Sequence, residues 1–208
     1  MTIDIDGTLT RVHGWRVIAD ALGQREAFER SNRRFFANEV GEDEHLDGLL
    51  NIAAGHPLAE VERALLATPK MDGIGEGVTS LHESGCRVAL LTHNPRYVCE
   101  WYCRSFGFDD FEGTTGQSVV DGVIGPAERV RADKAGGLRR LADRTGVLPA
   151  SVVHIGDGRA DALIFPVVGA GISLNSALPE VDRAADRVLR THDFREVVAT
   201  LEHLPPRT

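Results

Sequence analysis

Short apolar runs with strand character alternate with amphipathic helical stretches along this chain, and this alternation constrains the fold more than any other feature. Buried strands are predicted at residues 1–6, 87–92 and 151–155, with shorter ones at 169–174 and 187–189. Strands that alternate with helices are joined by crossover connections, which make neighbouring strands parallel. We therefore expect an α/β fold with a Rossmann-like parallel sheet and helices on both faces.

The stretch from residue 11 to residue 72 has no strand pattern. Apolar residues recur there at helical spacing, as Trp15 and Ile18 illustrate. A helical block inserted after the first strand predicts a second, smaller domain. We therefore expect a core domain of residues 1–10 and 73–208 and a helical cap domain of residues 11–72, called the cap below.

Two local signals predict boundaries inside the core domain. Asp121-Gly122, flanked by valines, suits the tight primed turn of a β-hairpin. Asn94-Pro95 follows a predicted strand, and both residue types favour helix starts. We expect a hairpin around Asp121 and a helix that Asn94 caps.

Charge and composition exclude several classes of function. The 208-residue chain has a formal net charge of −8, whereas a nucleic-acid-binding protein is expected to show a basic surface. The most apolar run, residues 163–172, is too short to span a bilayer. Asp4 and Asp6 lie where a signal peptide needs an apolar core. An odd number of cysteines suggests a reducing compartment, so we expect a cytoplasmic protein without nucleic-acid or membrane partners. These cysteines are Cys86, Cys99 and Cys103.

Acidic and hydroxyl residues follow the predicted strands. Asp4, Thr92 and Asp157 each lie at or just beyond a strand end. Active sites of open parallel sheets form outside the carboxyl ends of the strands, so the fold brings these residues together. Asp4 is the predicted nucleophile, since a carboxylate can attack phosphorus and form an aspartyl-phosphate. Asp6 is predicted to protonate the leaving oxygen and then to activate water.

Four carboxylates are expected to converge at this edge, because Asp157 and Asp161 flank a glycine-rich turn. Like charges at such range raise each other's pKa unless a cation intervenes. Oxygen ligands together with a phosphate substrate favour Mg²⁺. The predicted ligands are Asp4, the backbone carbonyl of Asp6, and Asp157. Asp161 is expected to act indirectly, through a neighbouring group or a metal-bound water.

Thr92 and Lys134 complete the predicted site. The Thr92 hydroxyl and nearby backbone N–H groups can hold a phosphate oxygen, aided by the helix N-terminus expected at Asn94. Lys134 can neutralise both the phosphoryl oxygens and the carboxylates. Gly136 and Gly137 come shortly after it in the same predicted helix. They lower helix stability, which indicates close backbone packing there.

Asp4-Ile5-Asp6-Gly7-Thr8, Thr92, Lys134 and Gly156-Asp157 through Asp161 occur in the order and at the strand ends typical of one family. With these motifs the chain resembles the haloacid dehalogenase-like superfamily, in its phosphatase branch. The resemblance covers most of the chain. It implies the roles given above for Asp4, Asp6, Thr92, Lys134 and Asp157, and an aspartate at position 6 is typical of phosphatases and phosphomutases.

The position of the helical insertion is similar to that of the cap in the phosphoserine phosphatase-like subgroup. That subgroup carries a glutamate shortly after the first motif, whereas here no acid occurs between Asp6 and Asp20. It also places glycines after the second-motif hydroxyl residue, whereas Thr92 is followed by His93 and Asn94. The sequence therefore does not specify phosphoserine as the substrate.

Substrate selection is expected to come from the cap and the loops that it covers. Asn94 is one candidate; the others, mostly basic or aromatic, are His13, Trp15, Arg16, Arg33, Arg34, His93, Arg96 and Arg159. The leading hypothesis is a Mg²⁺-dependent phosphatase for a small phosphorylated metabolite. A phosphotransferase or mutase, and a catalytically idle binding module, are the alternatives. The sequence does not predict an oligomeric state.

Overall fold

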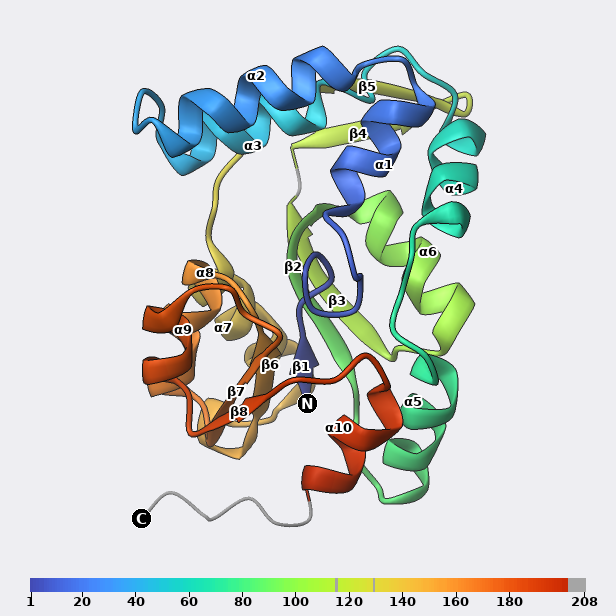
Figure 1. Cartoon of the computed structure of the whole chain (residues 1–208). Helices are drawn as coiled ribbons and strands as arrows, with labels where there is room; N and C mark the ends of the chain where they lie inside the picture. The colour runs from blue at the N-terminus through green and yellow to red at the C-terminus, as the bar shows by residue number, and fades with distance from the viewer. Residues whose placement is uncertain (115, 129, 202–208) are drawn as a thin grey trace.

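The computed structural model describes residues 1–114, 116–128 and 130–201, and its centre is a six-stranded parallel sheet in the order β3-β2-β1-β6-β7-β8 (Figure 1). The strands are β1 (Thr2–Ile3), β2 (Ala89–Pro95), β3 (Asp110–Thr114), β6 (Val153–Gly156), β7 (Ala170–Leu174) and β8 (Arg187–Leu189). In the central strand, Ile3 pairs with Leu90 on one side and with Ile155 on the other. The predicted Rossmann-like parallel sheet is confirmed.

Helices cover both faces of this sheet. One face carries α5 (Ile74–Glu83), α6 (Arg96–Phe106) and α10 (Phe194–Leu201), and the other carries α7 (Lys134–Thr145), α8 (Arg159–Ile164) and α9 (Pro179–Ala184). Short 3-10 helices at Pro149–Ser151 and Phe165–Val167 precede β6 and β7.

The alternation of side chains along β2 explains the two faces. Successive strand residues point to opposite sides of a sheet. Leu90 belongs to the apolar cluster that includes Val78 of α5 and Val98 of α6. Leu91 packs instead in the cluster with Leu138 of α7. Alternate apolar residues of β2 therefore pack against the helices on opposite faces of the sheet.

Four helices occupy the segment between β1 and α5. They are α1 (Gly14–Ala21), α2 (Arg25–Phe36), α3 (Glu42–Leu50) and α4 (Leu58–Ala67). Figure 1 shows them above the end of the sheet at which β1 and β2 finish. Among the described residues, each helix is either too short or too polar to cross a bilayer.

The predicted hairpin is present as β4 (Gln117–Val120) and β5 (Val123–Ala127). Asp121 and Gly122 both have positive φ angles, of 50° and 76°, as a primed turn requires. The hairpin lies against the cap: Gly55 N donates to Ile124 O at 2.7 Å, and Leu58 N donates to Gly122 O at 2.8 Å. Residues 117–127 therefore pack with the cap helices, and the division into residues 11–72 and the remainder stays a prediction.

Three local predictions differ from the structure. Strand β2 extends to Pro95, so α6 begins at Arg96 and Asn94 makes no capping hydrogen bond to it. The reason is that the Asn94 side chain is engaged with Asp6 and Trp15. Strand β3 was not predicted, because its half-buried sequence contains Glu112 and Gly113 and has no β-branched run.

Candidate active site

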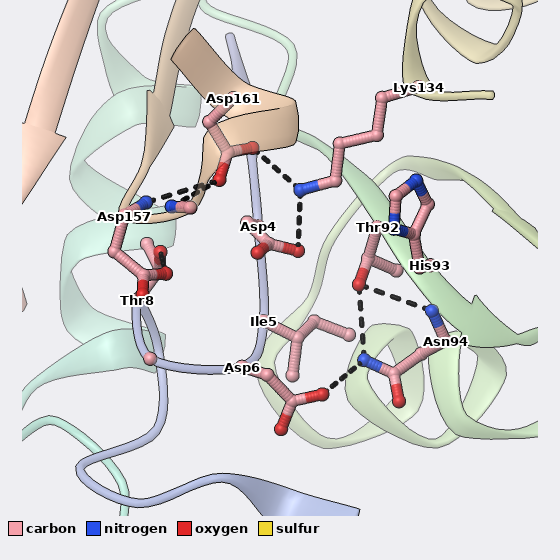
Figure 2. Close-up of polar contacts among 12 residues, drawn as sticks. Asp4, Ile5, Asp6, Thr8, Thr92, His93, Asn94, Lys134, Asp157 and Asp161 are labelled. Carbon is pink, nitrogen blue, oxygen red and sulfur yellow. Dashed lines mark hydrogen bonds and ion pairs between the residues drawn. The ribbon is translucent and has the colours of Figure 1, made fainter. Parts of the chain in front are cut away.

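The predicted site residues surround one cavity of about 570 Å³ at the carboxyl ends of β1, β2 and β6. Asp4 directly follows β1, and its backbone N–H donates to Ile155 O at 3.0 Å, which keeps the chain aligned beyond the strand. Asp157 directly follows β6, and Thr92 lies within β2. Figure 2 shows that these three side chains, from segments far apart in sequence, face a common centre.

Lys134 reaches this centre from the first position of α7. Its Nζ lies 2.6 Å from Asp161 Oδ1 and 3.1 Å from Asp4 Oδ1, and the side chain is only 4% exposed. Burial acts to lower the pKa of Lys134, but the two carboxylates outweigh it and hold this pKa above its usual value. A Cβ at Gly137 would come within 2.9 Å of Leu91 Cδ1, which explains the close packing expected at this helix start.

Asp161 is held by donors on both carboxylate oxygens. His154 Nε2 lies 2.9 Å from Oδ1, and the backbone N–H groups of Asp157 and Gly158 donate to Oδ2 at 3.2 and 2.9 Å. Burial raises the pKa of Asp161, but Lys134 and His154 reverse this and lower it. Because the ionised carboxylate only accepts, His154 Nε2 carries the proton in this contact. His154 Nδ1 in turn lies 2.9 Å from Thr2 Oγ1.

Three carboxylates, those of Asp4, Asp157 and Asp161, offer oxygens within 4.8 Å of one another. The Thr8 hydroxyl donates to Asp157 Oδ1 at 2.8 Å. Gly7 has a φ of +80°, and a Cβ there would overlap the Asp157 carboxylate. The loop after β1 thus adopts a conformation that glycine favours and that lets it approach Asp157 closely.

The charges of this cluster are incompletely balanced. Burial raises the pKa of Asp157 to about 8, with further contributions from Asp4 and Asp161. Burial likewise raises the pKa of Asp4, against the opposing effect of Lys134. A single ammonium group does not offset this concentration of carboxylates. The donor set is all oxygen and clustered, which fits a hard divalent cation.

Asp6 turns away from the carboxylate cluster and toward the cap. Its Oδ1 accepts from Gly14 N at 2.5 Å, and its Oδ2 accepts from Asn94 Nδ2 at 2.8 Å. His13 Nδ1 lies 3.9 Å from Asp6 Oδ1. Asn94 Oδ1 also accepts from Trp15 Nε1 at 3.1 Å. These contacts join the start of cap helix α1 to the loop after β1.

Thr92 lies beside this network. Its Oγ1 accepts from Asn94 N at 3.3 Å and from Asn94 Nδ2 at 3.1 Å, so its own O–H remains available as a donor toward the cavity. The expected aid from a helix N-terminus starting at Asn94 is corrected, since the strand continues to Pro95. Asn94 instead links Thr92, Asp6 and the cap.

Of the predicted substrate-binding residues, His13, His93, Asn94 and Arg159 line the cavity, as does Trp15. Arg159 Nε lies 3.2 Å from Glu180 Oε1. Burial lowers the pKa of His93 to about 4, and its buried Nε2 has no hydrogen-bond partner in the described part of the chain. Four further candidates do not line the cavity: Arg16, Arg33, Arg34 and Arg96.

Sequence reasoning missed several residues of this site. Glu42, Phe36 and His45 line the cavity from the cap, and nothing in their sequence context distinguishes them from ordinary helix residues. His154 did carry a signal, because it is a polar residue inside an apolar strand run. Its contacts with Thr2 and Asp161 explain why this strand tolerates it.

Comparison with known proteins gives relatives that are called phosphoserine phosphatases. The chain is 26% identical over 202 residues to that of Halobacterium salinarum, with 93% of each chain covered. It is also 26% identical over 185 residues to that of Archaeoglobus fulgidus, covering 85% of this chain but only about half (52%) of the relative.

Solved structures share the fold. A haloacid dehalogenase family hydrolase from Salmonella enterica serovar Typhi superposes with a TM-score of 0.83 at 17% identity, covering 95% of this chain and 69% of the other. A substrate-bound phosphoserine phosphatase gives a TM-score of 0.79 at 21% identity, covering 98% and 97%. The profile of one family, haloacid dehalogenase-like hydrolase, matches residues 1–169. With the strand-end acids and the parallel sheet described above, this match shows that the chain belongs to the haloacid dehalogenase-like hydrolases.

Proposed function

We propose that this protein is a Mg²⁺-dependent phosphomonoesterase that acts on a small phosphorylated metabolite through an aspartyl-phosphate on Asp4. The observation that carries the proposal is the placement of the Lys134 ammonium between the Asp4 and Asp161 carboxylates, with Asp157 close by, at the base of a cavity. The phosphoserine phosphatases among its relatives support the reaction class.

In the first step, an Asp4 carboxylate oxygen attacks phosphorus and the bond to the leaving alkoxide breaks. Asp6 gives that alkoxide its proton. Gly14 N and Asn94 Nδ2 hold the Asp6 carboxyl group beside the cavity and close to the chain that leads into the cap. Lys134 and the Thr92 hydroxyl stabilise the charge that develops on the phosphoryl oxygens.

In the second step, Asp6 takes a proton from water, the water oxygen attacks phosphorus, and the bond to Asp4 breaks. Phosphate leaves and the Asp4 carboxylate is restored. Division of one hydrolysis into two displacements is the general benefit of covalent catalysis.

The residues that would hold Mg²⁺ are Asp4, Asp157 and the backbone carbonyl of Asp6. The bound ion would neutralise negative charge shared by the phosphoryl group and the carboxylates. Asp161 would act indirectly, since Lys134, His154 and two backbone N–H groups already use both of its oxygens. The raised pKa values of Asp4 and Asp157 support a cation at this position.

A phosphotransferase would share the first step and give the phosphoryl group to a second alcohol in place of water. We propose hydrolysis as the main reaction on the strength of the named relatives. We also propose a cytoplasmic location, because Cys86, Cys99 and Cys103 are all free thiols.

The test is turnover of an aryl phosphate with Mg²⁺ and with EDTA. We expect turnover only with Mg²⁺, no turnover in Asp4→Asn, and slow phosphoenzyme formation with impaired release in Asp6→Asn. Circular dichroism should show that both variants fold. Turnover by Asp4→Asn at the wild-type rate would remove Asp4 as the nucleophile. A phosphorylated product formed from an added acceptor alcohol would favour the phosphotransferase instead.

A further inference from the structure

The cavity above the phosphoryl centre has a largely apolar wall contributed by the cap. Phe35 and Phe36 end α2, and Leu46 and Leu49 of α3 lie in the same lining. Phe36 is 73% exposed although it lines the cavity, so most of its surface is left uncovered. An alcohol group that leaves the phosphate toward the cap would therefore meet aromatic and aliphatic surface.

The cationic side chains in this lining are already paired. Arg11 Nη2 lies 2.6 Å from Asp72 Oδ2, and Arg159 Nε lies 3.2 Å from Glu180 Oε1. Lys134 is held between Asp4 and Asp161. Thus each lysine or arginine that lines the cavity in the described part of the chain has a carboxylate partner. The positive charge of each of these side chains is therefore already offset by a carboxylate of the protein, which weakens its attraction for a substrate carboxylate.

The cap adds a negative charge to the same wall. Glu42, the first residue of α3, lines the cavity with its side chain 49% exposed, and its Oε1 lies 3.6 Å from His93 Nδ1. The neighbouring Asp43 Oδ1 accepts from Ala132 N at 2.7 Å, two residues before Lys134. This contact holds the start of α3 beside the catalytic lysine.

Resting on the function proposed above, we propose that Glu42 is a specificity-determining residue. It selects phosphate esters of uncharged or cationic alcohols, whose aliphatic or aromatic part packs against Phe36, and it discriminates against alcohols that carry a carboxylate. Repulsion between the Glu42 carboxylate and a substrate carboxylate is the basis of the discrimination. A cationic group on the alcohol is attracted by the same Glu42 carboxylate.

The test compares four esters that differ in charge and ring content: 2-aminoethyl, 2-hydroxyethyl, carboxymethyl and benzyl phosphate. Two charges a few ångströms apart in a partly solvated site change affinity by about tenfold. We therefore expect wild-type kcat/KM for carboxymethyl phosphate to be about tenfold below that for the 2-hydroxyethyl ester. Glu42→Gln should remove this gap by raising the carboxymethyl value, and it should lower the 2-aminoethyl value while leaving the 2-hydroxyethyl value unchanged. Phe36→Ala should lower kcat/KM for the benzyl ester alone.

Glu44→Gln is the matched control. Glu44 lies in the same first turn of α3, pairs with Arg34 at 3.0 Å and does not line the cavity. Loss of the Glu44 charge should lower the stability of the start of α3 about as much as Glu42→Gln does. The control should nevertheless leave the order of kcat/KM values among the four esters unchanged. A carboxymethyl ester hydrolysed as well as the neutral one by the wild type, or an unchanged gap in Glu42→Gln, would overturn the proposal.

Measurements of ester binding distinguish the selectivity proposed for Glu42 from the phosphatase activity proposed above. Calorimetry on Asp4→Asn with Mg²⁺ gives the Kd of each ester without turnover, and we expect the carboxymethyl ester to bind most weakly. If the wild type hydrolyses none of the esters, the phosphatase proposal fails and the order of Kd values still decides the role of Glu42. Equal Kd values, or tightest binding of the carboxymethyl ester, would refute the selectivity.

Discussion

Lys134→Met should destabilise the metal-free protein strongly, because the substitution removes the positive charge between two buried carboxylates. Asp4 and Asp161 lie 3.1 and 2.6 Å from Lys134 Nζ, and the lysine side chain is 4% exposed. Removing one partner of a buried ion pair typically costs about 3–5 kcal/mol. That is a large part of the about 5–15 kcal/mol that stabilises a typical domain. Urea unfolding with EDTA measures the loss directly.

The pH dependence gives a second check on the same variant. Lys134 lowers the pKa of Asp161, so in the wild type this carboxylate contributes stability above its unfolded pKa and loses it as pH falls. The variant lacks that contribution, so its deficit should be larger at pH 7 than at about pH 2.5, which lies well below the ordinary aspartate pKa of 3.8. Lys70→Met is the control, since the chain's only other lysine lies over the Trp101 ring and donates to Thr68 O. A deficit below about 1 kcal/mol, typical of exposed ion pairs, or one equal at both pH values, would refute the reasoning.

Two further predictions concern the metal site and the link to the cap. The folded pKa of Asp157, raised to about 8, lies above its unfolded value, so the metal-free protein should lose stability as pH rises from 5 to 8, by at most about 1.4 kcal/mol per pH unit. Thermal unfolding should show this slope with EDTA and a smaller one with Mg²⁺; a melting temperature independent of pH would contradict it. Asn94→Ala removes the donor to Asp6 and the acceptor for Trp15, so it should cost about 1–3 kcal/mol in urea unfolding and lower kcat. Unchanged kcat would show that Asp6 needs no such support.

The sequence was most informative where chemistry coincides with strand ends. Asp4, Thr92 and Asp157 could be placed at one edge because residues near the carboxyl ends of neighbouring parallel strands lie at the same edge of the sheet. The partners of Asn94 could not be predicted, since its contact with Asp6 depends on how far β2 extends and on where the cap brings Trp15.

Predictions of tertiary contacts between segments distant in sequence were the weakest. The turn at Asp121 was predictable from two residues, whereas the packing of the hairpin on Gly55 and Leu58 depends on the whole cap. Glu42 shows the same limit. An acidic residue in the first turn of a helix is favoured by the helix dipole alone, and only the tertiary structure places it over a cavity.

The hairpin has a consequence for exchange of modules between related proteins. Gln117 Nε2 donates to Leu50 O at 2.9 Å, and Ile124 is buried against the helices, so this ribbon closes the underside of the cap although it is encoded after β3. A chimaera that transplants residues 11–72 alone would lose the contacts between the cap helices and the hairpin. A chimaera that exchanges residues 11–72 together with 117–127 keeps these contacts, so we expect any transfer of substrate specificity to require both stretches of chain.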